Sequence, residues 1–236
     1  WTGEYFTNIY NADLDPETGK AAKVNKFKSA INTKFHEASP VFTKDGKTVY
    51  FTRNNFINGK KGKDDHKITL IKIYKATLDE KNKWTNITEL PFNSDNYSVG
   101  HPALSPDEKT LYFSSDMPGS IGQSDLYKVS INSNGGYGTP ENLGNTVNTE
   151  GKETYPYLTN ENEIYFSSDG HPGLGGLDVF TANIEENGTI SNVQNVGADV
   201  NSPQDDFAYI IDPVSRRGFF SSNKDGGQGS DDIYKF

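Results

Sequence analysis

The composition and an internal repeat predict an all-β fold, a β-propeller of four-stranded antiparallel blades. The 236 residues include 13 Tyr, 14 Phe and 23 Gly, which favours strands and tight turns over long helices. An aromatic phrase recurs four times, with starts 62, 53 and 54 residues apart; it begins at Val49, Leu111, Ile164 and Gly218. Short strands repeating about every 50 residues are typical of propeller blades, whereas the structural alternative, a β-sandwich, requires no single period.

Two further phrases share this period. In the second, an aliphatic residue precedes an aromatic one; it recurs at Ile9, Ile73, Leu126, Val179 and Ile233. In the third, Asn precedes Ser or Thr; its members are Asn32, Asn93, Asn148 and Asn201. We expect these Asn side chains to form Asx-type turns that join adjacent blades. Three phrases with one period indicate that the repeat organises the whole chain.

Each repeat divides into strands a to d. Strand a lies at residues 40–43, 102–105, 156–159 and 208–211, the aromatic phrase is strand b, the aliphatic–aromatic phrase is strand c, and a weaker strand d follows strand c. Strands a, b and d occur four times and strand c five times, so the simplest complete object has five blades. The first blade then lacks a and b and the last lacks d, and we expect upstream residues to supply them, the chain being a mature or excised segment. A four-bladed closure, with the first c strand redundant, is the alternative. The predicted single domain 1–236 divides into a partial first blade 1–34, full repeats 35–97, 98–151 and 152–204, and a partial last blade 205–236.

Several phrases resemble a known family. Residues 105–113 (SPDEKTLYF) and 43–51 (TKDGKTVYF) resemble the WD40-like repeat of TolB-type propellers. Residues 166–178 (FSSDGHPGLGGLD) and 93–102 (NSDNYSVGHP) are similar to the propeller module of OmpA-family envelope proteins of Bacteroidota. The resemblance implies a periplasmic, outer-membrane-associated location and other envelope proteins as partners, in some members within type IX secretion or gliding machinery. Peptidoglycan binding in that family belongs to a separate domain, so it is not expected of these residues.

The charge and residue usage exclude several classes of function. The formal net charge of −9 argues against a nucleic-acid partner, because an acidic surface repels phosphate. The absence of Cys excludes disulfides, thiol catalysis and Cys-ligated metals. No apolar stretch is long enough to span a membrane.

The loops between strands b and c are rich in Gly and Asp. Their recurring carboxylates are Asp116, Asp125, Asp169, Asp178 and Asp232. Carboxylates and Gly carbonyls are Ca²⁺ ligands, which makes these five weak metal candidates. The main expectation is that each Asp accepts N–H groups of its own loop and that the protein holds no metal or cofactor.

Carboxylates also recur where strand a begins, near the expected central channel. Aligning the strands places Glu37, Glu153 and Asp205 at one position, and His101 follows the fourth member, Val99, by two residues. Inward carboxylates serve as acid and base in some five-bladed glycosidases, but a solvated ring at the axis is the main expectation.

One loop departs from the others. Residues 54–72 account for the 62-residue step and carry a basic cluster beside acidic residues, which makes the loop either a contact for an acidic partner or a solvated, mobile segment. The candidate binding face of the propeller is therefore Glu37, His101, Glu153, Asp205, Lys60, Lys61, Lys63 and His171.

Catalytic constellations of other kinds are missing from the sequence. It contains no Gly-x-Ser-x-Gly elbow, no His-Glu-x-x-His motif and no Gly-rich loop that opens a helix. The sequence therefore predicts a non-catalytic, protein-binding scaffold module of a bacterial cell envelope, and not an enzyme. The alternative is a carbohydrate-active propeller hydrolase or a Ca²⁺-dependent sugar-binding propeller.

Overall fold

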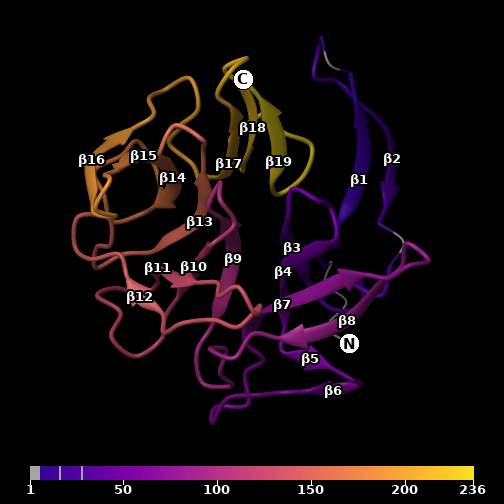
Figure 1. The fold of residues 1–236 in the computed structure, drawn as a ribbon. Coiled ribbons are helices and arrows are strands. Elements are labelled where there is room, and N and C mark those ends of the chain that lie inside the picture. Colours follow the sequence, from indigo (N-terminus) through magenta and orange to yellow (C-terminus); the bar gives the residue numbers. More distant parts are fainter. Residues whose placement is uncertain (1–5, 16, 28) are drawn as a thin grey trace. The chain divides into compact units, whose positions relative to one another are not determined.

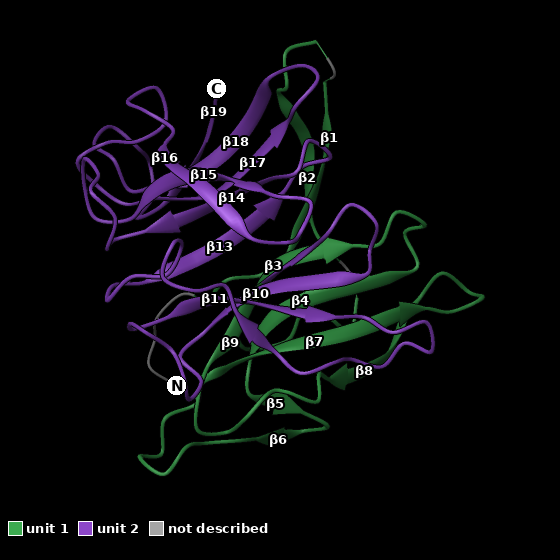
Figure 2. Cartoon of the chain, turned by 60° about the vertical axis from the view of Figure 1, so that its left-hand side comes forward, with its two compact units in different colours: residues 1–101 green, residues 102–236 purple. Residues whose placement is uncertain are grey.

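The computed structural model describes residues 6–15, 17–27 and 29–236. All regular structure in these residues is β-strand, so the all-β prediction is confirmed, and none of them lies in a helix long and apolar enough to cross a membrane. The chain divides into two compact units, residues 1–101 and 102–236, shown in two colours in Figure 2. Each unit is described by itself.

The first unit contains one four-stranded sheet and two small two-stranded sheets (Figure 1). The four-stranded sheet has the order β3 (Glu37–Phe42), β4 (Thr48–Asn54), β7 (Ile71–Leu78), β8 (Trp84–Glu89), and the two hairpins are β1 (Tyr10–Leu14) with β2 (Ala21–Lys26) and β5 (Phe56–Ile57) with β6 (Lys60–Lys61). Phe51, Tyr74 and Ile31 are fully buried and form the centre of this unit's core.

The second unit contains three antiparallel sheets, and the unit boundary falls within β9 (Val99–Leu104). The first sheet has the order β9, β10 (Thr110–Ser115), β11 (Asp125–Ser130), β12 (Glu141–Asn142); the second is β13 (Glu153–Leu158), β14 (Glu163–Ser168), β15 (Asp178–Ile184), β16 (Ile190–Asn195); the third is β17 (Asp206–Asp212), β18 (Arg217–Ser222), β19 (Asp232–Lys235). Strand β13 contacts β10 and β11, and β17 contacts β14 and β15, so each innermost strand packs on the sheet before it.

Four sheets have strands a, b and c in antiparallel order, and three of them also have strand d. The structure therefore contains four blades, which is the count of the four-bladed alternative. The fifth blade of the main prediction is represented only by β1 and β2, which stand where strands c and d of a partial first blade are expected. All residues of strands β1 and β2 are solvent-exposed.

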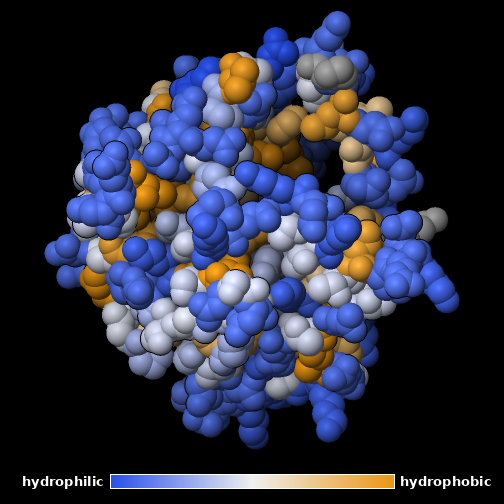
Figure 3. Space-filling model, in the orientation of Figure 1, coloured by the Kyte–Doolittle hydropathy of each residue, from blue (hydrophilic) through white to orange (hydrophobic). Residues whose placement is uncertain are grey.

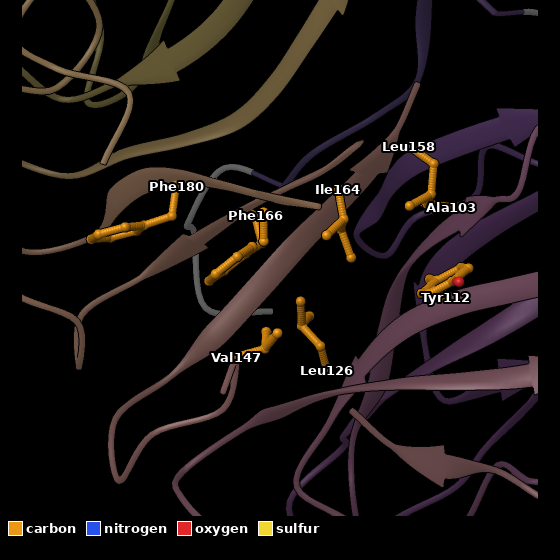
Figure 4. Close-up of a cluster of buried hydrophobic side chains, with 9 residues drawn as sticks. Ala103, Tyr112, Leu126, Val147, Leu158, Ile164, Phe166 and Phe180 are labelled. Atoms are coloured by element: carbon orange, nitrogen blue, oxygen red, sulfur yellow. The ribbon is translucent and has the colours of Figure 1, made fainter. Parts of the chain in front are cut away.

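The repeated aromatic phrase forms the buried layer between sheets. In the second unit, Phe166 and Ile164 of β14 meet Leu126 of β11 and Val147, all at most 1% exposed, and Figure 4 shows them pointing toward one another. Burying side chains of this size stabilises a fold by about 1.5–3 kcal/mol each. Outside this layer, hydrophilic residues predominate on the face seen in Figure 3, and hydrophobic residues there form small scattered groups.

Strand a of every blade contains a residue with positive φ, and in three blades this residue lies in a bulge. Ser39, His101, Tyr155 and Ala208 have φ angles of 48°, 53°, 51° and 53°, and three register shifts are recorded at this place, between Ala38 and Val41, Thr154 and Tyr157, and Phe207 and Ile210. A bulge turns the next side chains away from the regular alternation of a strand. It therefore decides which residues of strand a face the same way in different blades.

Candidate functional site

The bulges correct the alignment of the carboxylates at the start of strand a. Counting back from Ala208, the residue that corresponds to Glu37 and Glu153 is Asp206, not Asp205 as the sequence alignment predicted. Asp206 opens β17 and pairs with Ser222, as Glu153 opens β13 and pairs with Ser168.

These three aligned carboxylates are buried, and each accepts hydrogen bonds from the residue four positions earlier. Glu153 is 0% exposed and accepts hydrogen bonds from Thr149 N (2.8 Å), Thr149 Oγ1 (2.7 Å) and Ser168 Oγ (2.6 Å). Glu37 accepts from Thr33 N at 2.9 Å and Asp206 from Ser202 Oγ at 2.8 Å. The expectation of a solvated ring is therefore wrong at Glu37 and Glu153, and neither side chain is accessible to a substrate as acid or base.

The partners of these carboxylates belong to the repeated Asn-Ser/Thr phrase. Asn148 accepts from Leu126 N at 2.7 Å and donates to Leu126 O at 3.0 Å, so its amide pairs with the backbone of strand c. The next residue, Thr149, bonds to the carboxylate that opens the following strand a. The phrases of Asn32, Asn148 and Asn201 therefore join strand c of one repeat to strand a of the next. The Asn93 phrase, in contrast, bonds to Ile73 of strand c and is followed by Val99, which has no carboxylate.

The Asp residues of the b-to-c loops also hold local backbone in place. Asp125 accepts from Ile121 N (2.7 Å) and Gly122 N (3.0 Å), Asp178 from Leu174 N and Gly175 N, and Asp232 from Gln228 N and Gly229 N. Asp169 accepts from Lys152 N at 2.6 Å, and Asp116 is exposed. Among the described residues, no group of three His, Asp or Glu side chains could hold a metal ion.

Asp178 differs from its counterpart Asp125 in one respect. Asp125 Oδ2 also accepts from Asn142 Nδ2 at 2.6 Å, whereas Asp178 Oδ1 and Asp206 Oδ1 are buried without a hydrogen-bond partner among the described residues. Burial, together with the charges of Asp206 and Asp205, raises the pKa of Asp178, although the N–H groups of Gly175 and Leu174 act in the opposite direction. The charged form of Asp178 is therefore disfavoured in the fold.

Replacing Asp178 by Asn is expected to stabilise the protein at neutral pH by about 1 kcal/mol, because an amide keeps an acceptor and removes a buried charge. The folded-state pKa of Asp178 lies above the unfolded value of about 3.9, so Asp178 stabilises the fold below about pH 4 and this contribution is lost as the pH rises through the raised pKa. Urea denaturation should show the gain at pH 7 and none at pH 3.5. The matched Asp125→Asn variant should lose stability; equal effects of both changes would contradict the argument.

The side chains of the two candidate histidines, His171 and His101, contact or are covered by other residues of the fold. His171 lies 2.7 Å from Val147 O through Nε2, and its ring packs on Phe180 at 5.2 Å and on Phe166 at 5.9 Å. Burial lowers the pKa of His101 to about 4, which keeps its imidazole neutral at physiological pH, and its backbone N donates to Thr52 Oγ1 at 2.8 Å.

The candidate lysines Lys60 and Lys61 form β6, and Lys63 follows it; all three are exposed.

We use the name Tyr155 patch for Tyr155 and Phe207, Asp231, whose charge acts on Tyr155, and Asp205, which lies two residues before Phe207. Of these, only Asp205 is a site residue that the sequence predicted. The half-buried rings of Tyr155 and Phe207, on β13 and β17, lie 5.1 Å apart. Burial and the charge of Asp231 raise the pKa of Tyr155 to about 12. Asp205 directly precedes β17, is half-buried and accepts from Leu177 N at 2.8 Å, while Asp231 is exposed. The bulge at Tyr155 is the feature that sequence inspection lacked.

Comparison with known proteins identifies the fold. No protein-family model and no curated protein sequence matches the chain. An alpha-L-arabinofuranosidase from Lactobacillus brevis is similar in structure with a TM-score of 0.58 at 12% identity, over 92% of this chain and 78% of that one. A puromycin-hydrolyzing peptidase from Mycobacterium tuberculosis matches with a TM-score of 0.51 at 15% identity over 88% of this chain, and a Hadza microbial sialidase with 0.51 at 14% over 85%. The fold is a β-propeller, as the sequence predicted.

The same comparison corrects the prediction of function. The chain spans only 30% of the peptidase and 44% of the sialidase. The solved structures similar to this chain are mostly hydrolases, which contradicts the predictions that the chain is a non-catalytic scaffold module and that it is not an enzyme.

Proposed function

We propose that this chain is a carbohydrate-active propeller, and that the Tyr155 patch contacts the sugar. The observation that carries the proposal is the match to the arabinofuranosidase, in which the part like this chain makes up 78% of the protein. In the puromycin-hydrolyzing peptidase the corresponding share is 30%, and this sequence has no Gly-x-Ser-x-Gly elbow for a serine nucleophile. A sugar substrate therefore fits the chain better than a peptide.

The chemistry of the Tyr155 patch supports this proposal. Aromatic side chains provide a large apolar face with, in Tyr, a polar edge, and binding sites combine such faces with a few polar groups that fix orientation. Glycoside hydrolysis requires two carboxyl groups that reach the scissile bond. Because Glu37 and Glu153 are buried, we assign this work to Asp205 and Asp231, which are accessible.

Separate Asp205→Asn and Asp231→Asn variants, assayed on a panel of oligosaccharides that includes arabinans, test the assignment. Each change is expected to lower kcat/KM by about 100-fold or more, because it removes an acid or base. Glu186→Gln is the matched control, an exposed carboxylate in the turn between β15 and β16, and should leave turnover unchanged. Failure to turn over any glycan, or full activity of both Asn variants, would contradict the proposal.

The repeat phrases further support placing the chain among TolB-type propellers of OmpA-family envelope proteins. The periplasmic, outer-membrane-associated location that this family implies is part of the same proposal. Fractionation of cells that carry the full-length protein tests it: recovery with the outer membrane supports the location, and recovery in the cytosolic fraction contradicts it.

A further inference from the structure

The loop of residues 54–72 forms a cluster of lysines and aromatic rings together with residues 34 and 35. We define the lysine–phenylalanine cluster as Lys34, Phe35, Phe56 and Lys61. The rings of Phe35 and Phe56 lie 4.5 Å apart, and both are half-buried. Lys34 Nζ and Lys61 Nζ lie 5.6 and 5.5 Å from the centre of the Phe35 ring. All members belong to the first unit.

The hairpin that presents this cluster is an ordered structure. Asn58 and Gly59 have φ angles of 50° and 80°, the combination of a two-residue type I′ turn, and Phe56 pairs with Lys61 across β5 and β6. Phe56 N donates to Tyr74 OH at 3.1 Å, which ties β5 to the blade. The hairpin base is held by the buried Asn55, whose Nδ2 donates to Asp95 Oδ1 at 2.6 Å.

Within the part of the chain that the structure describes, the lysines of the cluster lack an acidic partner. Among the described residues, no ion pair within 4.0 Å involves Lys34 or Lys61. Two nearby acidic residues have other roles, since Glu37, three residues after Lys34, pairs with Arg53 Nε at 3.1 Å and Asp64, three residues after Lys61, accepts from His66 N and Ile68 N. A patch of this kind attracts carboxylate groups locally, even in a chain of net charge −9.

We propose that the lysine–phenylalanine cluster binds an acidic polysaccharide, one whose sugar rings carry carboxylates. The proposal rests on the proposed carbohydrate function and names the substrate class. A sugar ring offers an apolar C–H face to the Phe35 and Phe56 rings, and its carboxylate pairs with the ammonium groups beside them. Charge complementarity selects acidic over neutral chains, and the rings select a sugar over an anion that has only charge.

Calorimetric titration with tetragalacturonate tests the proposal, with maltotetraose as the neutral probe. We expect the intact protein to bind tetragalacturonate at least ten-fold more tightly than maltotetraose, and Lys34→Glu/Lys61→Glu to abolish this preference. Lys81→Glu/Lys83→Glu, which changes two exposed lysines of the same unit, should retain it. Equal binding by the Lys34→Glu/Lys61→Glu protein would overturn the proposal, as would equally strong competition by oligoglutamate or duplex DNA at the same charge concentration.

Asp205→Asn protein separates this proposal from the proposed function. The second unit carries Asp205 and the first carries the cluster, so the variant should bind tetragalacturonate as the unaltered protein does. Unchanged binding together with full glycan turnover would refute only the assignment of Asp205. Loss of the preference for tetragalacturonate in Lys34→Glu/Lys61→Glu, with normal turnover of neutral glycans, would support the cluster independently.

Discussion

Replacing Arg53 by Ala is expected to lower the free energy of unfolding by about 3–5 kcal/mol, the usual effect of removing one partner of a buried ion pair. Arg53 Nε lies 3.1 Å from Glu37 Oε1, and the two side chains are 3% and 0% exposed. The guanidinium also donates to Ile31 O at 2.5 Å. Without Arg53, the Glu37 carboxylate stays buried with no cation beside it, and the Ile31 carbonyl loses its donor.

The chain itself provides a charge-free version of this pair. Val99 opens β9 and Ser115 ends β10, the positions that Glu37 and Arg53 hold on β3 and β4. The double variant Glu37→Val/Arg53→Ser should therefore recover most of the stability that Arg53→Ala loses, because no uncompensated charge remains. Urea denaturation of the three proteins checks this. A double variant as unstable as Arg53→Ala would show that the destabilisation comes from lost packing and not from the unpaired carboxylate.

The repeated aromatic phrases predicted the strands well because each phrase marks a position that is buried in every blade. Phe51, Phe113, Phe166 and Phe220, which share one place in the first phrase, are all 2% exposed or less. Burial on both faces of a blade requires an apolar residue there, so this part of the fold was visible in the sequence.

The alignment failed by one residue at Asp205 because two Asp residues are adjacent and the bulge is not visible in the sequence. The signal that would have found Asp206 is the Ser202 four residues earlier, which corresponds to Thr33 before Glu37 and Thr149 before Glu153. Local spacing to a hydroxyl donor is therefore a better guide to these carboxylates than the strand pattern.

The ordered hairpin in the basic loop was predictable and was missed. Asn58-Gly59 is the strongest short-range sign of a two-residue hairpin, but the surrounding lysines favoured a solvated loop.

The Tyr155 patch, in contrast, depends on side chains from β13, β17 and the loop before β19. Their proximity follows from the packing of sheets and the bulge at Tyr155, which no local pattern encodes.

Replacing Glu153 by Ala is expected to lower the free energy of unfolding by about 3–5 kcal/mol, because three donors lose their acceptor in a buried site. Two donors belong to Thr149 and one to Ser168, at 2.6–2.8 Å from the carboxylate. The change also separates the Asn148 phrase from strand β13, so the loss should appear in hydrogen exchange of both β11 and β13 as well as in urea denaturation.

Glu153→Asp is the informative control, because Asp206 shows that the shorter side chain still reaches the hydroxyl four residues earlier. Asp206 accepts from Ser202 Oγ at 2.8 Å, while its Oδ1 has no hydrogen-bond partner among the described residues. We therefore expect Glu153→Asp to keep the bonds to Thr149, to lose the one to Ser168 and to cost about 1–2 kcal/mol. Glu153→Asp could instead destabilise the protein as much as Glu153→Ala. The blades of β11 and β13 would then be held together by the bond to Ser168 and the packing of the Glu153 side chain, and not by the link to the Asn-Ser/Thr phrase.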